Sequence, residues 1–196
     1  MSPRMSGQER RKNILMKALS IIFEEGFHAL TIRKIADSCG ITEAALYRHF
    51  ENKEDLINSL TRPLFDQKML PESTDEEKDP YQELYGFMYR QFSHLEKNPQ
   101  LTAILFQEEI FRQYPDIRVK FNQHRQKREE KIMKLILSGQ KQGIIDRGVK
   151  PRIFALLYMG SIRISVLRWR NEGFSYSLAE EADHITEELF KLLKEN

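Results

Sequence analysis

Apolar residues recur at helical spacing in the first third of the chain. The first stripe begins after Asn13 and places apolar side chains at positions 14, 15, 18, 19, 22 and 23 before Gly26 ends it. This spacing is typical of an amphipathic helix, and a glycine commonly follows a helix C-terminus. Three shorter helical patterns follow over residues 31–39, 42–50 and 52–64, with a kink or break expected at Pro63.

Five further helical patterns follow an acidic, apolar-free loop at residues 71–80. Proline lies at or near three of their starts, where its missing N–H costs nothing. No segment has the length and pattern of a strand. The chain is therefore predicted to be all-α, with about nine helices. The five C-terminal helices are expected at residues 81–97, 100–112, 116–142, 151–171 and 178–194.

These patterns divide the chain into three parts. Residues 1–12 are polar and arginine-rich, so we expect a flexible basic arm. Residues 13–60 are expected to form a small helical unit. Residues 61–196 are expected to form a larger helical bundle.

Composition narrows the class of protein. The 31 basic and 29 acidic residues give a formal net charge of +2, which excludes a strongly basic nucleic-acid binder but not a local basic patch. The single cysteine excludes an internal disulfide and a cysteine-based zinc site. The best apolar run, Ile153 to Ile162, is ten residues long, whereas a membrane span needs about 20. We expect a cytoplasmic protein with no membrane partner, no cofactor and no metal.

Residues 31–50 carry the most specific signal in the chain, and they read TIRKIADSCGITEAALYRHF. Two short helical patterns are joined by a turn at Gly40. Ile35 and Leu46 can pack the two helices, and the small Ala36 allows them to approach closely. This is the geometry of a helix-turn-helix, whose second helix enters the major groove of DNA.

Over residues 14–60 the chain resembles the TetR family of bacterial transcriptional regulators. The C-terminal two thirds match that family only in the number and layout of helices. The resemblance implies a three-helix DNA-binding unit followed by a bundle for ligand binding and dimerisation. It implies a ligand-responsive regulator, more commonly a repressor, that binds a two-fold symmetric operator as a dimer. The fragments that carry it are FEEGF at 23–27, TIRKIA at 31–36, GIT at 40–42, LYRHF at 46–50 and NKEDL at 52–56.

Phosphate contacts are expected at helix N-termini and beside the turn. Thr31 is first of all a helix cap, and the resemblance adds a phosphate contact at the same place. Arg33 can bind either phosphate or a base. The resemblance implies further phosphate contacts from Tyr47, His49 and Lys53.

Base contacts are expected from the second short helix, where Thr42, Ala44 and Arg48 lie on the face not needed for packing. Arg48 can bind guanine through two hydrogen bonds, and Ala44 can contact a thymine methyl group. Glu43 either accepts a hydrogen bond from cytosine or caps the helix. We favour the cap.

A single helix-turn-helix contacts too few base pairs to be selective, so we expect a homodimer with recognition helices about 34 Å apart. The last helix has apolar residues at spacings of 4, 3, 4 and 3, which is typical of helix-on-helix packing. The resemblance places the dimer contacts on the last two helices; alternatively, both stripes serve the subunit's own core. The candidates are Phe154, Leu157, Ser161, Ile164, Leu178, Ala182, Ile185, Leu189 and Leu192.

Large apolar residues are frequent in the middle helices. By default each belongs to the core, and the alternative is an apolar cavity for a small-molecule effector. The resemblance implies that such an effector releases the DNA. Arg163 either anchors an acidic group of the ligand or forms a structural ion pair with Glu108 or Glu109. The apolar candidates are Tyr85, Met88, Tyr89, Phe92, Phe106, Ile110 and Phe121.

Two other classes of protein are compatible with parts of the sequence, a di-iron enzyme and an adaptor protein. A di-iron enzyme needs two helical Glu-x-x-His pairs. The pair Glu181 and His184 fits, but Glu25 and His28 lie on either side of Gly26, so we predict that the protein is not an enzyme. An all-α adaptor that binds only proteins is the alternative, although it does not explain the pattern over residues 31–53.

Overall fold

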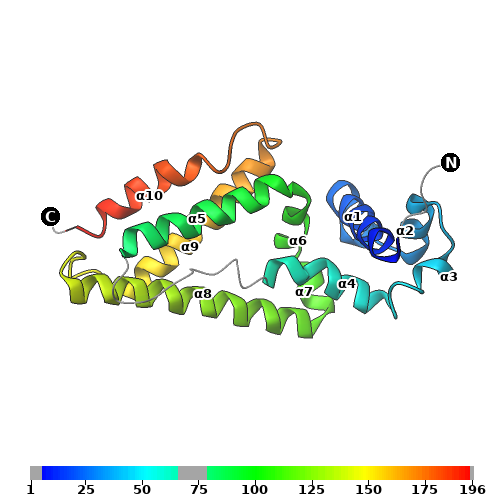
Figure 1. Cartoon of the computed structure of the whole chain (residues 1–196), viewed down its shortest axis with the longest axis horizontal. Helices are drawn as coiled ribbons and strands as arrows, with labels where there is room; N and C mark the ends of the chain where they lie inside the picture. Colours follow the sequence, from blue (N-terminus) through cyan, green and yellow to red (C-terminus); the bar gives the residue numbers. More distant parts are fainter. Residues whose placement is uncertain (1–5, 66–78, 195–196) are drawn as a thin grey trace. The chain divides into compact units, whose positions relative to one another are not determined.

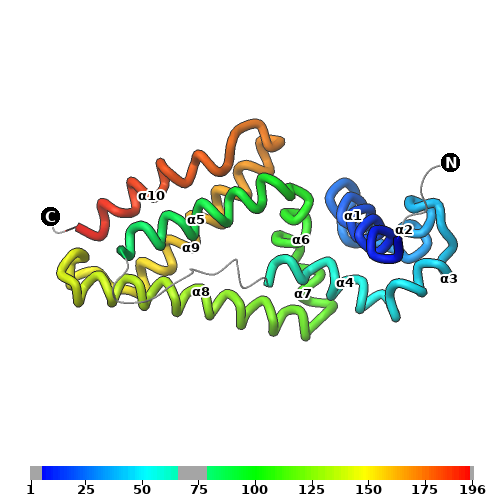
Figure 2. Tube along the Cα trace, in the orientation of Figure 1, coloured from blue at the N-terminus to red at the C-terminus, as the bar shows by residue number. Residues whose placement is uncertain are grey.

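The computed structural model describes residues 6–65 and 79–194. All regular elements in this part of the chain are helical, which confirms the predicted all-α fold (Figures 1 and 2). The chain divides into two compact units. Residues 6–65 and 100–120 form the N-terminal unit, and residues 79–99 and 121–194 form the C-terminal unit. The predicted acidic loop lies, up to residue 78, outside the described residues.

The first helix, α1 (Gly7–Glu25), begins earlier than its apolar stripe predicts. Its start is a capping box, in which the Ser6 hydroxyl accepts from the Glu9 N–H at 3.2 Å and the Ser6 N–H donates to the Glu9 carboxylate at 2.7 Å. The bond from the Ser6 N–H is the main reason why the pKa of Glu9 lies below its usual range. Residues 7–12, expected in a flexible arm, are therefore helical; residues 1–5 lie outside the described chain.

The first helix of the predicted helix-turn-helix is α2 (Ile32–Cys39). The Thr31 hydroxyl caps it by accepting from the Lys34 N–H at 3.1 Å. The helix ends at Gly40, whose φ of 63° and ψ of 37° lie in the left-handed region. Only glycine adopts this conformation without strain, which explains the sharp turn at this position.

Two further caps fix the helices after the turn. Thr42 opens α3 (Glu43–Leu46) by accepting from the Ala45 N–H at 3.1 Å. Asn52 opens α4 (Lys53–Thr61), because its side chain accepts from a first-turn N–H at 2.9 Å. The cap expected at Thr31 is thus confirmed, and the structure adds caps at Thr42 and Asn52.

Prolines and chain geometry interrupt two predicted helices. The pattern over 52–64 changes to a 3₁₀ turn (Arg62–Phe65) at the expected break. The helix predicted over 100–112 is interrupted at Gln107, whose φ is −93° and ψ 89°. Ile104 and Ile110 would lie about 120° apart on a continuous helix, and on either side of the break both are buried, at 0% and 1% exposure. The pieces are a 3₁₀ turn (Pro99–Leu101), α6 (Thr102–Leu105) and α7 (Glu108–Gln113).

The C-terminal unit is a helical bundle with Tyr158 in its core. The Tyr158 side chain is fully buried, and its hydroxyl donates to the Leu84 carbonyl at 2.5 Å. Its ring stacks on Phe87 with centroids 6.1 Å apart. Burial raises the pKa of Tyr158, because the charged form would lose its hydration. The helices are α5 (Pro80–Lys97), α8 (Pro115–Gln142, of which residues 121–142 belong here), α9 (Pro151–Asn171) and α10 (Glu181–Lys191).

In residues 6–65 and 79–194, no helix combines the length and the apolar character needed to cross a membrane. The same residues contain no group of three or more His, Cys, Asp or Glu side chains placed to hold a metal ion.

Candidate DNA-binding surface

A small buried core holds the helix-turn-helix together. Ile35 and Ala36 on α2 and Leu46 on α3 are at most 1% exposed. The backbone N–H of Ile41 donates to the Ala36 carbonyl at 3.0 Å, which fixes the turn against α2. Phe50, 1% exposed, joins the same core after α3. These positions orient α3 so that its other side faces solvent.

The exposed side of α3 and of the turn that follows it carries five of the predicted DNA contacts. Tyr47 is 45% exposed, and Thr42, Glu43, Ala44 and Arg48 are exposed as well. Glu43 and Tyr47, like Ala44 and Arg48, are four residues apart and therefore lie on one side of a helical turn. We call these five residues the recognition surface. It combines one arginine, one aromatic ring, a hydroxyl and a methyl group, which are groups that can contact phosphates and base edges.

Four further candidates flank the recognition surface. Thr31 and Arg33 are exposed at the start of α2. The Arg33 Nε lies 4.0 Å from a carboxylate one turn further along, and a surface pair of this kind contributes at most about 1 kcal/mol. His49 and Lys53 are half-buried. The Lys53 Nζ lies 5.7 Å from the centroid of the Phe27 ring, a cation–π arrangement that places the ammonium group at the start of α4.

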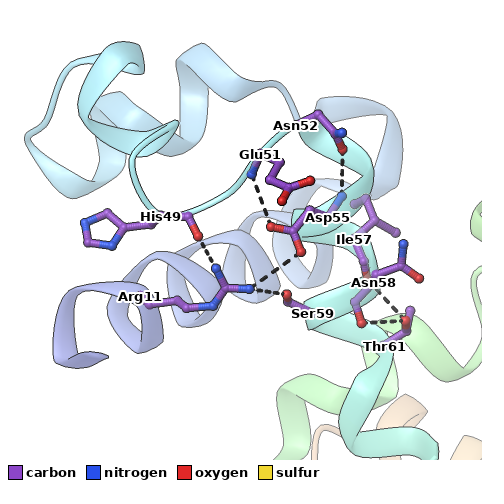
Figure 3. A network of polar contacts seen from close by, with 9 residues as sticks. All are labelled: Arg11, His49, Glu51, Asn52, Asp55, Ile57, Asn58, Ser59 and Thr61. Atoms are coloured by element: carbon purple, nitrogen blue, oxygen red, sulfur yellow. Dashed lines mark hydrogen bonds and ion pairs between the residues drawn. The ribbon is translucent and has the colours of Figure 1, made fainter. Parts of the chain in front are cut away.

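Arg11 of α1 links the end of the recognition surface to α4 (Figure 3). Its Nη1 donates to the His49 carbonyl, and its Nη2 donates to the Ser59 hydroxyl at 2.7 Å. Its Nη2 also lies 3.7 Å from the Asp55 carboxylate. This role of Arg11 was not predicted, because residues 1–12 were expected to form a flexible arm. The available signal was that Arg11 precedes Ile14 by three residues, in register with the apolar stripe of α1.

Asp55 is the other centre of this network. One of its carboxylate oxygens accepts from the Glu51 N–H at 3.2 Å, and the other pairs with Arg11. Its own N–H donates to the Asn52 side chain at 2.9 Å. These contacts explain the structural role of the fragment NKEDL. Its asparagine and aspartate fix the segment between the recognition surface and α4.

Helix α9 carries an exposed apolar face in the C-terminal unit. Leu157 and Ile164, both predicted dimer contacts, are 49% and 63% exposed. Ile153 and Leu156 are 51% and 66% exposed and extend the same stripe, because positions 153, 156, 157 and 164 share one side of a helix. We call these four residues the α9 face. Sequence reasoning missed Ile153 and Leu156 because both sides of α9 are apolar.

Three of the predicted dimer contacts are buried inside the C-terminal unit, which corrects the prediction for them. Phe154 is 3% exposed, and Leu178 and Ala182 are completely buried. They fill the subunit's own core, since α10 packs on α5 and on α9. The apolar stripe of the last helix thus serves mainly that core. Among the remaining candidates, Ser161, Ile185 and Leu189 are half-buried and Leu192 is 55% exposed.

The predicted ligand-binding residues are divided between the two units. Phe106, half-buried, and Ile110, 1% exposed, belong to the N-terminal unit. Met88 and Phe92 are completely buried on α5 in the C-terminal unit, and Phe121 is half-buried at the start of its part of α8. The structure therefore does not bring all of these candidates together within one unit.

Two of the predicted ligand residues lie at the surface instead. Tyr85 and Tyr89 stack with ring centroids 5.9 Å apart in a shallow cleft between α5 and the region of α10. Tyr89 is 44% exposed. A hydrogen bond to Asp183 is the main reason why the pKa of Tyr85 is raised. Arg163 is exposed on α9, next to Ile164, so it does not line the interior of the C-terminal unit.

A different arginine, Arg128, is half-buried in the C-terminal unit. Burial lowers the pKa of Arg128 on α8 to about 10, since the guanidinium has lost hydration. Its Nε donates to the His124 Nδ1 at 3.2 Å, and His124 is 5% exposed. An imidazole that accepts this bond is neutral and does not compensate the charge. Sequence reasoning missed Arg128 because it lies in the most highly charged stretch of the chain.

Comparison with known proteins agrees with this architecture. Residues 14–60 match the family described as bacterial regulatory proteins, tetR family, and residues 64–193 match the C-terminal region of YsiA-like proteins. The second match alone covers more than half of the chain. The chain therefore belongs to the TetR family of bacterial regulatory proteins, and its C-terminal region is of the YsiA-like type. This membership confirms the predicted class, a ligand-responsive DNA-binding regulator.

The chain is also similar over most of its length to individual bacterial regulators. The chain is 28% identical over 177 residues to the HTH-type transcriptional repressor KstR2 of Mycobacterium tuberculosis, with 87% of this chain and 86% of that protein covered. It is 26% identical over 184 residues to the fatty acid metabolism regulator protein of Bacillus subtilis, with 92% and 94% covered. The fold matches the crystal structure of FadR from Bacillus subtilis in complex with stearoyl-CoA, with a TM-score of 0.73, 24% identity, and 93% and 99% of the two chains covered. These relatives are regulators rather than enzymes.

Proposed function

We propose that this regulator is a repressor that binds a two-fold symmetric operator as a homodimer and is released by a small molecule. The observation that carries the proposal is the recognition surface: five exposed residues on a helix-turn-helix whose opposite side is fixed in a buried core. Apart from Thr42 and Glu43, which stabilise the start of α3, these exposed side chains add nothing to the buried core. The proposed site of action is the cytoplasm, where bacterial DNA lies.

The residues around the turn are proposed to divide the work. Thr42, Ala44 and Arg48 contact base edges, where Arg48 fits guanine and Ala44 fits a thymine methyl group. Phosphates bind to the groups that flank these readers, which fixes the register on the duplex. Glu43 stays at the N-terminus of α3 as a favourable charge for the helix dipole. The proposed phosphate contacts are Thr31, Arg33, Tyr47, His49 and Lys53.

The α9 face supports the dimer. Four apolar side chains, each about half exposed or more, form one stripe on a single helix. A contiguous apolar patch on a soluble domain marks an interaction surface. A second copy of the chain satisfies it in an isologous contact, because the same stripe faces itself across a two-fold axis. Leu192, 55% exposed, is available to extend this contact. The recognition surface lies within the proposed DNA-binding domain, 13–60, and the α9 face lies within the proposed regulatory domain, 61–196.

DNA binding is tested with an operator selected from random duplexes. The wild-type protein is expected to select a two-fold symmetric site, and its affinity is expected to fall steeply as salt rises. Replacing Tyr47 and Lys53 with alanine together should weaken binding about 10- to 100-fold without lowering the melting temperature. The matched control replaces the exposed Tyr89 and Lys134 of the C-terminal unit and should bind normally. Wild-type affinity in the first double variant would contradict the proposal and favour an adaptor that binds only proteins.

For the effector, the proposal is an amphipathic anion with a long apolar chain, such as a fatty acyl thioester of coenzyme A. Arg128 supports an anionic group, since a half-buried guanidinium that donates to an imidazole rather than to a carboxylate gains from a negative charge. Two of the similar proteins support the same class of effector. One is named a fatty acid metabolism regulator, and the structure of FadR contains stearoyl-CoA.

The effector class is tested by adding long-chain acyl thioesters, the free fatty acids or coenzyme A alone to the preformed DNA complex. Only the acyl thioesters or the fatty acids should release the DNA. Arg128→Met should raise the required concentration at least about tenfold with DNA affinity intact, as expected for losing a charged partner. Arg125→Met, an exposed change on the same helix, is the control. Complexes that resist saturating amounts of all three compounds would overturn this effector class.

A further inference from the structure

We propose that Arg11 is a positioning residue, which sets the recognition surface for DNA while its own guanidinium binds only to the protein. The inference rests on the proposed DNA-binding function of that surface. Neither the helical pattern of α1 nor the family resemblance assigns Arg11 a part in it.

The Arg11 guanidinium makes polar contacts through both of its terminal nitrogens (Figure 3). Its Nη1 donates to the carbonyl of His49, in the turn directly after α3, and its Nη2 donates to the Ser59 hydroxyl of α4 at 2.7 Å. The flat face of the group lies over the Phe50 ring, 4.1 Å from the ring centroid. The Asp55 carboxylate lies 3.7 Å from the same Nη2. Three segments, from α1, the end of the turn and α4, therefore meet at one side chain.

The recognition surface needs such a support because α3 is very short. It spans only Glu43–Leu46, and an isolated helix of that length is not stable in water. Tyr47 and Arg48 lie in the turn that follows, beyond the last residue of α3. His49 follows these two residues, beyond the end of α3. Its carbonyl accepts from Arg11, next to the two side chains that are proposed to contact DNA.

The same network also reaches the proposed phosphate contact at the start of α4. Asp55 accepts from the Glu51 N–H at 3.2 Å, and its own N–H is bound by Asn52 at 2.9 Å. Lys53 lies between these residues as the first residue of α4. Arg11 thus holds the two ends of the segment 49–55, so that Tyr47, Arg48 and Lys53 are fixed relative to one another.

A direct phosphate contact is the competing role for Arg11, and the salt dependence of binding distinguishes the two. The slope of log K against log salt is negative. Loss of one phosphate contact makes it less steep by about 0.9. Loss of a positioning residue lowers the affinity but leaves the slope unchanged, because the phosphate contacts that form are the same in number.

The experiment compares Arg11→Met, Arg11→Lys and Lys53→Ala on the selected operator at several salt concentrations. Arg11→Met should lower the affinity at least about tenfold with an unchanged slope. Lys53→Ala should make the slope less steep by about 0.9. Arg11→Lys keeps the charge and one donor, so it should recover part of the affinity. The neighbouring exposed Lys12→Met is the matched control and should stay within about twofold of the wild type. Wild-type affinity in Arg11→Met, or a slope that becomes less steep as in Lys53→Ala, would overturn the proposal.

Hydrogen exchange without DNA provides the second readout. In Arg11→Met, and in Arg11→Lys to a smaller extent, the backbone N–H groups of residues 47–50 should exchange faster, while those of α9 should not change. This measurement does not depend on operator binding. If the wild type binds no DNA, the proposed function fails while the exchange result stands; unchanged exchange at residues 47–50 would contradict the positioning role itself.

Discussion

The two units of this protein expose different chemistry on their helices. In the N-terminal unit the exposed side of α3 carries short polar groups, a tyrosine and an arginine, while its apolar side chains are buried. In the C-terminal unit the exposed side of α9 carries Ile153, Leu156, Leu157 and Ile164. The first surface suits a hydrated polyanion, and the second suits another protein surface. The difference supports the two proposed roles, DNA binding for the recognition surface and dimerisation for the α9 face.

The largest effect is expected from a charge on the α9 face. Leu156→Arg together with Ile164→Arg should convert the dimer into a monomer, since an uncompensated buried charge costs about 3–5 kcal/mol. Light scattering after gel filtration measures the mass, and operator affinity should fall in parallel. Leu137→Arg, a change at a 46% exposed leucine of α8, serves as the control. A double variant that remains dimeric would show that the α9 face is not the interface.

A smaller effect is expected when the same residue type is truncated in the core of the N-terminal unit. Leu46→Ala should lower the free energy of unfolding by about 2–5 kcal/mol, because the fully buried side chain leaves a cavity. Leu137→Ala should change it by no more than about 0.5 kcal/mol. Urea unfolding followed by circular dichroism measures both. Equal losses in the two variants would mean that α3 is not fixed by its core.

The smallest effect concerns the buried hydroxyl of Tyr158. Tyr158→Phe removes the hydroxyl that donates to the Leu84 carbonyl and should cost about 1 kcal/mol. Because the folded-state pKa is raised, the folded protein keeps this proton when the unfolded chain, with an ordinary tyrosine pKa of about 10, begins to lose it.

The contribution of Tyr158 is therefore complete below about pH 10 and decreases as the pH rises above that value. Thermal unfolding from pH 7 to 11 should show a steeper loss of stability in the wild type than in Tyr158→Phe. Parallel pH profiles would contradict the assignment of this raised pKa.

Local signals in the sequence predicted the helix-turn-helix well, and signals that depend on distant contacts were missed. The caps at Thr31, Thr42 and Asn52 act within three residues, so the chain itself displays them. The contacts of Arg11 join residues 38 and 48 positions apart, and no local pattern records them. For the same reason the packing of residues 100–120 with the N-terminal unit could not be predicted.

The C-terminal helices show the limit of periodicity most clearly. An apolar stripe indicates that a helix face is covered. It does not indicate whether the subunit's own core or a partner subunit covers it. Leu178 and Ala182 belong to a stripe with dimer-like spacing, yet they are buried in their own subunit, whereas Leu156 was not selected and is 66% exposed. The side that faces outward is decided by the neighbouring helices, α5 in the case of α10.

Site-specific cross-linking tests the central claim, that the recognition surface contacts DNA, most directly. A photoreactive amino acid is placed at position 44 or 48 in the recognition surface, or at position 137 in the C-terminal unit, and the operator complex is irradiated. Cross-links to bases are expected from positions 44 and 48, and none from position 137. An operator complex that forms normally but gives no cross-link from either recognition position would contradict the account.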